Sequence, residues 1–251
     1  MKRIVKIEPF YEPRIWGGGT RLAEEFHYKT DVEPLGEVYN VVALAGHADC
    51  FVPEMNRTLS QLYIDCPEWF QCETPELPVR VNILDPVEDL SIQIHPDDDF
   101  AAKYNGGRGK PEAWVILDTP EDGEIEFGHY AETKEEFKNW TENHRWDKLL
   151  RYLKAEKDGF INIPAGTLHA IGKGVLTYNV SRNADCTLRL YDYDRIDPSR
   201  GQKREIQPEE VYDNVNLPDK MISFQQFPEA DEFGVKVPRY WDEPGLYTLY
   251  R

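Results

Sequence analysis

The stretch Ser91-Ile92-Gln93-Ile94-His95-Pro96-Asp97-Asp98 is typical of a short strand that runs into a tight turn. Side chains alternate between the two faces of a strand, so the isoleucines point one way and Ser91, Gln93 and His95 point the other. A polar row on a buried strand costs free energy unless water, hydrogen-bond partners or a metal ion satisfies it. We therefore expect other parts of the chain to supply partners for this row.

Composition and charge limit the class of protein. With 251 residues, of which 40% are hydrophobic and 12% aromatic, the chain can bury a sizeable core as one large domain or two small ones. The net charge of −17 and the pI of about 4.8 argue against nucleic acid or an anionic membrane as a partner. This charge would repel a phosphorylated substrate, so a site for one must contain clustered lysine or arginine side chains.

Location and redox state are indicated by apolar runs and cysteines. No apolar run approaches the roughly 18 residues that a membrane span needs. Lys6, Glu8 and Pro9 interrupt the short apolar run near the start, which is therefore no signal peptide, and we expect a cytoplasmic protein. The cysteines form no CxxC pair, so we expect free thiols rather than disulfides or a thiolate metal site. They are Cys50, Cys66, Cys72 and Cys186.

Short alternating segments predict a mainly β fold. Strands are predicted at 36–44, 50–52, 79–85, 91–95, 111–118, 160–163, 175–181, 187–193, 221–227 and 244–250. Short helices are predicted at 21–26, 97–104 and 207–216. One long helix should begin at the capping box Thr133–Glu136 and run to about Leu153, unless Asn143-His144 interrupts it. The absence of GxGxxG, P-loop and βαβ patterns favours a sandwich or a jelly-roll barrel.

Three further side chains could join His95 around a metal ion. Glu112 begins the strand after a glycine-rich loop, His169 follows a Pro-Ala-Gly turn, and Gln93 shares the face of His95. Two imidazoles, a carboxylate and an amide oxygen suit a divalent ion such as zinc, and a position left to water or substrate would allow catalysis. The alternative is that hydrogen bonds within the protein satisfy each histidine.

Two basic residues accompany these groups. Lys110 lies two residues before Glu112 and shares its face if the segment is extended. Arg189 alternates with two leucines, and two arrangements are open for it. If the leucines face a core between sheets, Arg189 lies at the surface and pairs with Asp185 or Asp192. If the strand lines a barrel, Arg189 points into the cavity.

Four motifs, SIQIHPDD, GKPEAW, IPAGTLHAIGKGVL and RLYDYDR, occur in this order between residues 91 and 195. Together with RIWGG at 14–18 and the Gly36-Glu37 pair, they resemble the type I mannose-6-phosphate isomerases, especially the compact bacterial form. The resemblance runs from about residue 8 to about residue 215. It implies a cupin-type jelly roll and an enzyme that interconverts mannose 6-phosphate and fructose 6-phosphate, or a related sugar phosphate, through a cis-enediol.

The resemblance also implies roles for individual residues. The metal ligands fall on Gln93, His95, Glu112 and His169, which would hold one Zn²⁺ per chain or another divalent ion. Arg189 falls on the arginine at the reacting part of the substrate, and Lys110 on a lysine with a proton-transfer or phosphate role. Ser91 and Asp185 fall on positions that bind substrate. The base that moves the proton is left open between a metal-bound water, His95 and Asp185.

The sequence departs from the family pattern around the expected pocket. A usual Glu-x-Gln-Gln run is Asn179-Val180-Ser181-Arg182 here. A usual Trp is Tyr39, and a usual Ser-Ala-His is Val42-Ala43-Leu44. We expect these places to line the substrate pocket, and Arg182 would add positive charge to it if that side chain faced inward.

Domain organisation is also inferred from the resemblance. Residues 1–220 are expected to form the metal-binding cupin domain, with helical insertions at about 54–78 and 133–154. Residues 221–251 are expected to form a short β segment, the remnant of a second lobe that is short or missing. An unpaired edge there would recruit another chain, so a monomer or a homodimer is expected.

Three functions remain as alternatives. The first is the sugar-phosphate isomerase. The second is a non-catalytic or regulatory sugar-binding cupin that retains a structural metal, which the altered pocket and the missing lobe favour. The third is a cupin oxygenase with iron on two histidines and a carboxylate, which would have no need for Lys110 and Arg189.

Overall fold

The computed structural model describes residues 4–72, 74–225, 229–232, 235–243 and 247–250. Its strands are β1 (Phe10–Pro13), β2 (Leu35–Val41), β3 (Phe51–Val52), β4 (Arg57–Thr58), β5 (Val79–Leu84), β6 (Ile92–Ile94), β7 (Glu112–Asp118), β8 (Glu124–His129), β9 (Leu150–Lys154), β10 (Phe160–Ile163), β11 (His169–Ile171), β12 (Leu176–Arg182), β13 (Leu188–Tyr191), β14 (Ile196–Asp197), β15 (Gln202–Lys203), β16 (Glu229–Glu232), β17 (Val235–Glu243) and β18 (Tyr247–Tyr250). Its helices are α1 (Arg21–Glu24), α2 (Leu59–Asp65), α3 (Asp98–Asn105), α4 (Lys134–Glu142), α5 (Trp146–Leu149) and α6 (Pro208–Asn214), with short 3₁₀ turns at Pro53–Met55 and Pro67–Trp69.

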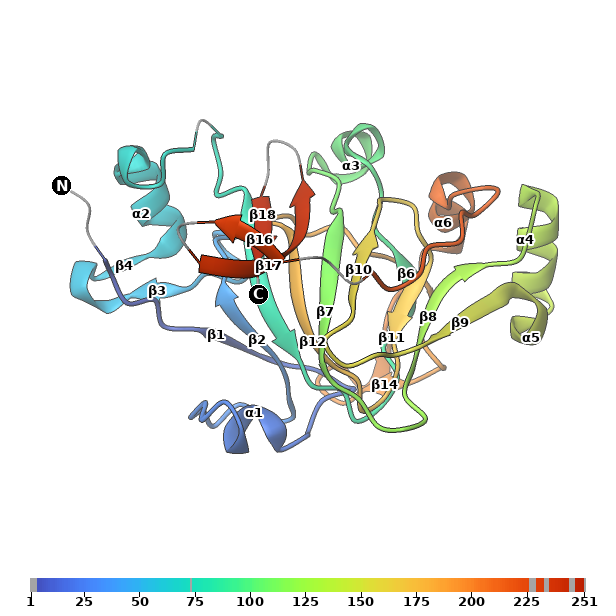
Figure 1. Ribbon diagram of the computed structural model, residues 1–251. Coiled ribbons are helices and arrows are strands. Elements are labelled where there is room, and N and C mark those ends of the chain that lie inside the picture. The colour runs from blue at the N-terminus through green and yellow to red at the C-terminus, as the bar shows by residue number, and fades with distance from the viewer. Residues whose placement is uncertain (1–3, 73, 226–228, 233–234, 244–246, 251) are drawn as a thin grey trace.

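Two antiparallel sheets form the body of the molecule. The larger has the strand order β1-β2-β5-β12-β7-β10, and the smaller has the order β13-β6-β11-β8-β9 (Figure 1). Apolar side chains of both sheets, among them Trp114, Ile116, Phe127 and Ile171, belong to one buried cluster. The mainly β fold with two packed sheets is confirmed, and in the described part of the chain the two sheets do not close into a continuous barrel.

Helices lie at both ends of this sandwich (Figure 1). Helices α4 and α5 lie beside β8 and β9, whereas α2 lies at the opposite end beside β3 and β4 (Figure 1). Phe137 of α4, Leu149 of α5 and Val211 of α6 pack into the same cluster as Ile92 and Ile94 of β6. The isoleucine face of the opening stretch is therefore buried beneath helices, which leaves its polar face to the space between the sheets.

The helix predicted from Thr133 is interrupted at Asn143-His144, the alternative that the sequence left open, so the uninterrupted helix to Leu153 is wrong. Helix α4 ends at Glu142 with Asn143 as its C-cap, and His144 adopts a positive φ of 52°, which turns the chain before the short helix α5. Residues 150–154, expected to be helical, instead form β9 and pair with β8 at the sheet edge. The Thr133 hydroxyl does accept a hydrogen bond from the Glu136 amide, so the predicted start of the helix is confirmed.

Strand β8 was not predicted, although Glu124-Ile125-Glu126-Phe127 alternates polar and apolar residues as an edge or half-buried strand does. The strand predicted at 221–227 is also wrong over its described part. Residues 221–225 contribute only a bridge between Gln225 and Phe160, and residues 226–227 lie outside the described residues.

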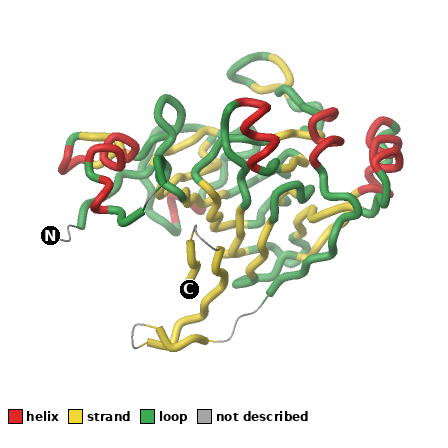
Figure 2. The backbone as a smooth tube through the Cα atoms, turned by 90° about the horizontal axis from the view of Figure 1, so that it is seen from above, coloured by secondary structure: helices red, strands yellow, loops and turns green. Residues whose placement is uncertain are grey.

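The C-terminal strands form a sheet of their own, in the order β16-β17-β18. This sheet stands off the main body when the molecule is viewed from above (Figure 2). The predicted boundary at residue 220 stays a prediction. Within the described ranges, the helices lack the length and apolarity that crossing a membrane requires. All the cysteines are free thiols, as predicted.

Replacing Glu126 by glutamine is expected to change how stability depends on pH. Burial, with a smaller effect of Asp89, raises the pKa of Glu126 to about 7, and its Oε2 has no hydrogen-bond partner in the described structure. When folding raises the pKa of a carboxyl group, the group stabilises the folded state fully below its unfolded-state pKa, which is near 4.5 for Glu126. This stabilisation is lost as the pH rises through 7. As the pH rises from 5 to 8, the free energy of unfolding of Glu126→Gln should therefore increase by about 2–3 kcal/mol relative to that of the wild type. Denaturant unfolding at the two pH values measures this change.

Glu124→Gln is the matched control, because Glu124 lies on the same strand with its side chain exposed. The difference in free energy of unfolding between Glu124→Gln and the wild type should change by no more than about 0.5 kcal/mol between pH 5 and pH 8. A Glu126→Gln difference that does not change with pH would mean that Glu126 is ionised throughout this range.

Candidate active site

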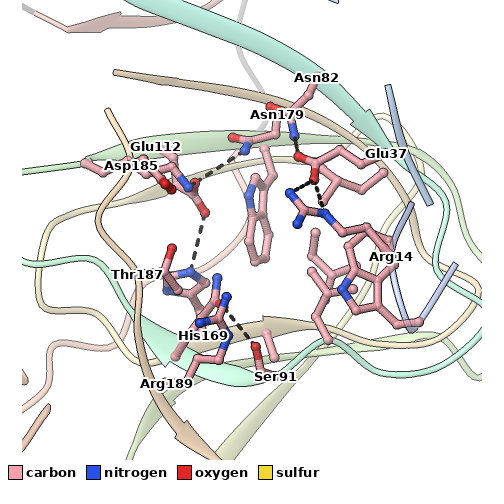
Figure 3. Close-up of a pocket in the computed structure, with 18 of the residues that line it drawn as sticks. Arg14, Glu37, Asn82, Ser91, Glu112, His169, Asn179, Asp185, Thr187 and Arg189 are labelled. Carbon is pink, nitrogen blue, oxygen red and sulfur yellow. Dashed lines mark hydrogen bonds and ion pairs between the residues drawn. The ribbon is translucent and has the colours of Figure 1, made fainter. Parts of the chain in front are cut away.

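A cavity of about 190 Å³ lies between the two sheets. Strands β2, β5, β7 and β12 line it from the larger sheet, and β6, β11 and β13 line it from the smaller one. Side chains from both sheets converge on it, among them Glu112, His169 and Arg189 (Figure 3). The pairing of the strands explains how residues far apart in the sequence meet in this cavity.

One row of side chains crosses three strands of the larger sheet. Arg80 of β5 lies directly opposite Ser181 of β12, and Ser181 lies directly opposite Glu112 of β7. Residues directly opposite each other in antiparallel strands project from the same face, so this row shares the face that lines the cavity. Asn82 and Asn179 form the next row on the same face.

A second row crosses the smaller sheet. Arg189 of β13 lies opposite Gln93 of β6, and Gln93 lies opposite His169 of β11. His95, two residues beyond Gln93, projects from the same face. The polar row recognised in the opening stretch thus faces the cavity, across from Glu112.

Both histidines present an unprotonated Nε2 to the carboxylate of Glu112. His95 Nδ1 donates a hydrogen bond to the Cys186 carbonyl at 2.9 Å, and His169 Nδ1 donates to the Thr167 carbonyl at 2.8 Å. Because a carbonyl can only accept, each Nδ1 carries the hydrogen. Burial lowers the pKa of both histidines, and in the neutral imidazole the lone pair then lies on Nε2. Each Nε2 lies 3.4 Å from an oxygen of Glu112, and the three ligand atoms lie within 4.8 Å of one another.

This arrangement fits a metal ion. Nε2 of His169 is buried and has no hydrogen-bond partner in the described structure, and lone pairs that face a carboxylate repel it unless a cation lies between them. Burial, and next the charge of Lys110, lowers the pKa of His95 to about 3, so this imidazole is neutral at pH 7, as a metal ligand must be. The side chain of Gln93 lines the same cavity, and its Oε1 accepts a hydrogen bond from Ser91 at 3.1 Å.

Lys110 is the buried cation of this cluster. Its Nζ lies 3.0 Å from Glu112 Oε2 and 3.0 Å from His95 Nε2, and the residue is only 5% exposed. Burial, and next the charge of Arg80, lowers the pKa of Lys110. Since these two partners already engage the ammonium group, Lys110 belongs to the metal-ligand end of the cavity.

Arg189 and Asp185 both line the cavity, but they lie in different surroundings. Arg189 points inward, as the barrel-lining arrangement predicted, and its Nε has no hydrogen-bond partner among the described residues. The alternative arrangement, in which Arg189 pairs with Asp185 or Asp192 at the surface, is not the one observed. Asp185 lies beside His47, and Asp192 binds Arg195 and Arg204. The Asp185 side chain is 56% exposed and lies 3.2 Å from His47 Nε2.

Sequence reasoning missed three arginines and one carboxylate of the cavity. Arg14, Arg80 and Arg204 line it together with Lys110 and Arg189, so the clustered basic groups that a phosphorylated substrate needs are present. Glu37 accepts hydrogen bonds from Arg14 at 2.7 Å and from Asn82 at 2.5 Å (Figure 3). The alternation of Val79-Arg80-Val81-Asn82 was the available signal for Arg80, but it does not tell which face is the inner one.

The departures from the family pattern fall only partly on the cavity. Asn179 lines it and donates to Glu112 at 3.3 Å, and the Ser181 hydroxyl accepts a hydrogen bond from Arg80 at 3.1 Å. Arg182 does not face inward, because the alternation of β12 turns it away, where it binds Asp98. Of the other departures, Tyr39 lines the cavity whereas residues 42–44 do not.

Comparisons with known proteins agree with this site. The family model described as phosphomannose isomerase type I, catalytic domain, matches residues 4–128. The probable mannose-6-phosphate isomerase GmuF of Bacillus subtilis is 40% identical over 250 residues, which are 98% of this chain and 78% of that protein. The crystal structure of the mannose 6-phosphate isomerase from Bacillus subtilis superposes with a TM-score of 0.91 at 32% identity, and covers 98% of this chain and 78% of that one.

A zinc-bound mannose 6-phosphate isomerase superposes with a TM-score of 0.64 at 16% identity over 86% of this chain and 75% of that one, a likeness of fold alone. The 40% identity to GmuF extends over almost the whole chain and over most of that relative. The cavity of the described structure also joins residues of the four motifs, in Gln93, Lys110, His169 and Arg189. The chain therefore belongs to the type I phosphomannose isomerase family.

Proposed function

We propose that this protein is a metal-dependent isomerase that interconverts mannose 6-phosphate and fructose 6-phosphate. The observation that carries the proposal is the meeting of a buried His95–Glu112–His169 set with clustered cationic side chains in one cavity. The donor set suits a divalent ion, and the cations suit a phosphorylated substrate. The cytoplasmic location and the monomeric or dimeric state stay predictions.

We assign the ion as zinc, held by His95, Glu112, His169 and the amide oxygen of Gln93. The assignment is supported by the neutral imidazoles, by the buried carboxylate and by the family's zinc-bound structure. When bound, a divalent ion supplies Lewis-acid stabilisation of negative charge on a substrate oxygen. Ser91, which donates to Gln93, would orient the amide toward the ion.

The chemistry requires that one proton leaves C2 of the aldose and one is added at C1, while a hydroxyl proton passes from O2 to O1. Negative charge develops on oxygen along this path, and the half-buried Arg189, which lines the cavity, is placed to stabilise it. His95 uses one ring nitrogen toward Cys186 and the other toward the metal site, which leaves it no role as the base. Of the side chains that the sequence offered for this role, Asp185 and Lys110 then remain as carriers of the proton.

The test is an assay of zinc-loaded protein against a panel of sugar phosphates, with unphosphorylated mannose as the control. We expect interconversion of mannose 6-phosphate and fructose 6-phosphate with turnover of at least about 1 s⁻¹, and little reaction with mannose. If zinc is bound but no sugar phosphate of the panel is interconverted, the result would support the non-catalytic sugar-binding cupin instead. Substrate-dependent oxygen uptake by iron-loaded protein would support the oxygenase.

A further inference from the structure

The basic side chains of the cavity differ in whether a carboxylate neutralises them. Arg14 binds Glu37, Lys110 binds Glu112, and Arg204 binds Asp192; these pairs lie at 2.6, 3.0 and 2.6 Å. Arg80 and Arg189 have no carboxylate within 4.0 Å among the described residues. A buried guanidinium without a counter-ion is costly, so these two positions are where an anionic ligand would gain most.

Arg80 is both buried and held in place. It is 5% exposed, its Nε donates to the Ser181 hydroxyl at 3.1 Å, and its guanidinium carbon lies 5.5 Å from the centre of the Tyr39 ring. No described residue accepts a hydrogen bond from its two terminal NH₂ groups. These groups form a planar fork that matches two oxygens of a phosphate, which a lysine cannot do in the same way.

Arg80 also lies at a suitable distance from the metal ligands. The row Arg80–Ser181–Glu112 spans three neighbouring strands, so the Cα atoms of Arg80 and Glu112 are about 9–10 Å apart. A hexose phosphate whose C1 and C2 lie beside Glu112 would place its phosphate toward the other end of this row. Lys110 is less suited to the phosphate, because Glu112 and His95 already engage its ammonium group.

The space between these two ends carries matching polar groups. Asn82 and Asn179 lie opposite each other on the cavity face, and their amide nitrogens donate to Glu37 and Glu112. Their Oδ1 atoms are buried and have no partner in the described structure. Two unpaired acceptors there suit hydroxyl groups of a sugar chain (Figure 3).

We propose that Arg80, held by Ser181, binds the phosphate group of the substrate at the end of the cavity remote from the metal ligands. This inference rests on the proposed isomerase function for the identity of the ligand. It assigns the phosphate to Arg80 rather than to Lys110, and it gives Ser181, a departure from the family pattern, a role in positioning.

Titration with inorganic phosphate tests the site without catalysis. Arg80→Met should weaken phosphate binding at least about tenfold, and Ser181→Ala should weaken it about three- to tenfold. Arg182→Met is the matched control, because Arg182 follows Ser181 on the same strand and faces away from the cavity, and it should bind phosphate within about twofold of wild type. Equal binding by Arg80→Met and wild type would overturn the proposal.

Stability and kinetics supply independent readouts. Because Arg80→Met removes an unpaired buried charge, its melting temperature without phosphate should be at or above that of wild type. Added phosphate should raise the melting temperature of this variant less than it raises that of wild type. With mannose 6-phosphate, KM should rise at least about tenfold while kcat and zinc content change little. A fall in kcat at unchanged KM would instead place Arg80 at the reacting end and contradict the assignment.

The outcomes for the site and for the function are separable. If wild type binds phosphate through Arg80 yet interconverts no sugar phosphate, the anion site stands and the proposed function fails. If wild type converts mannose 6-phosphate to fructose 6-phosphate, but Arg80→Met binds phosphate as tightly as wild type, the function stands and the Arg80 assignment fails.

Discussion

Replacing His95 by alanine is expected to remove the metal and the isomerase activity together. His95 supplies one of three ligand atoms that lie within 4.8 Å of one another, and the Cys186 carbonyl orients its ring. Without this imidazole, only Gln93, Glu112 and His169 of the four assigned ligands would remain, and they would hold the ion more weakly. Losing metal stabilisation of several kcal/mol corresponds to a fall in kcat/KM of at least about 10³-fold.

Zinc content after dialysis, measured on the same sample as the activity, provides the check. His144→Asn is the control, because His144 is exposed in the turn between α4 and α5 and asparagine tolerates its positive φ. That variant should keep both zinc and activity. If His95→Ala keeps stoichiometric zinc, the ligand assignment is wrong.

Replacing Arg189 by methionine should lower kcat by about 10²–10³-fold with zinc still bound. Arg189 faces the cavity beside Gln93 and His169, but it is not a metal ligand. It is a cation without a carboxylate partner in the described structure, and burial, then the charge of Arg204, lowers its pKa. Its removal should therefore act on charge that develops in the transition state.

The lysine variant separates charge from geometry. Arg189→Lys should recover part of kcat, because it restores a cation without the planar fork. Arg200→Met, at a side chain that is 71% exposed, should leave both constants unchanged. A rise in KM at constant kcat in Arg189→Met would mean that Arg189 only binds substrate.

Strand alternation in the sequence predicts which side chains share a face of a strand, but not which face lines the cavity. It placed Gln93 and His95 on one face and Ile92 and Ile94 on the other, and helix-covered packing of the isoleucines confirms this division. It could not decide between inner and outer face for Arg189, because that depends on which sheet face is covered. The spacing of the predicted strands made Glu112 and His169 candidate partners of His95, and the motif resemblance then implied that they are metal ligands.

The features that were missed depend on contacts between distant segments. Arg80 becomes a cavity residue only through the register of β5 with β12, about 100 positions later in the chain, which no local pattern specifies. The same register turns Arg182 outward, so the inward orientation in which it would add positive charge to the pocket is not the one observed. The helix expected to reach Leu153 failed for a local reason, since the left-handed backbone at His144 lets residues 150–154 pair with β8 instead.

Removal and return of the metal tests the central claim most directly. Wild-type protein stripped with a chelator should interconvert mannose 6-phosphate and fructose 6-phosphate at least about 10³-fold more slowly. Reloading with one equivalent of zinc should restore the rate on the same sample. Stripped protein that keeps the full rate, or fully zinc-loaded protein with no interconversion, would contradict a metal-dependent isomerase site at His95, Glu112 and His169.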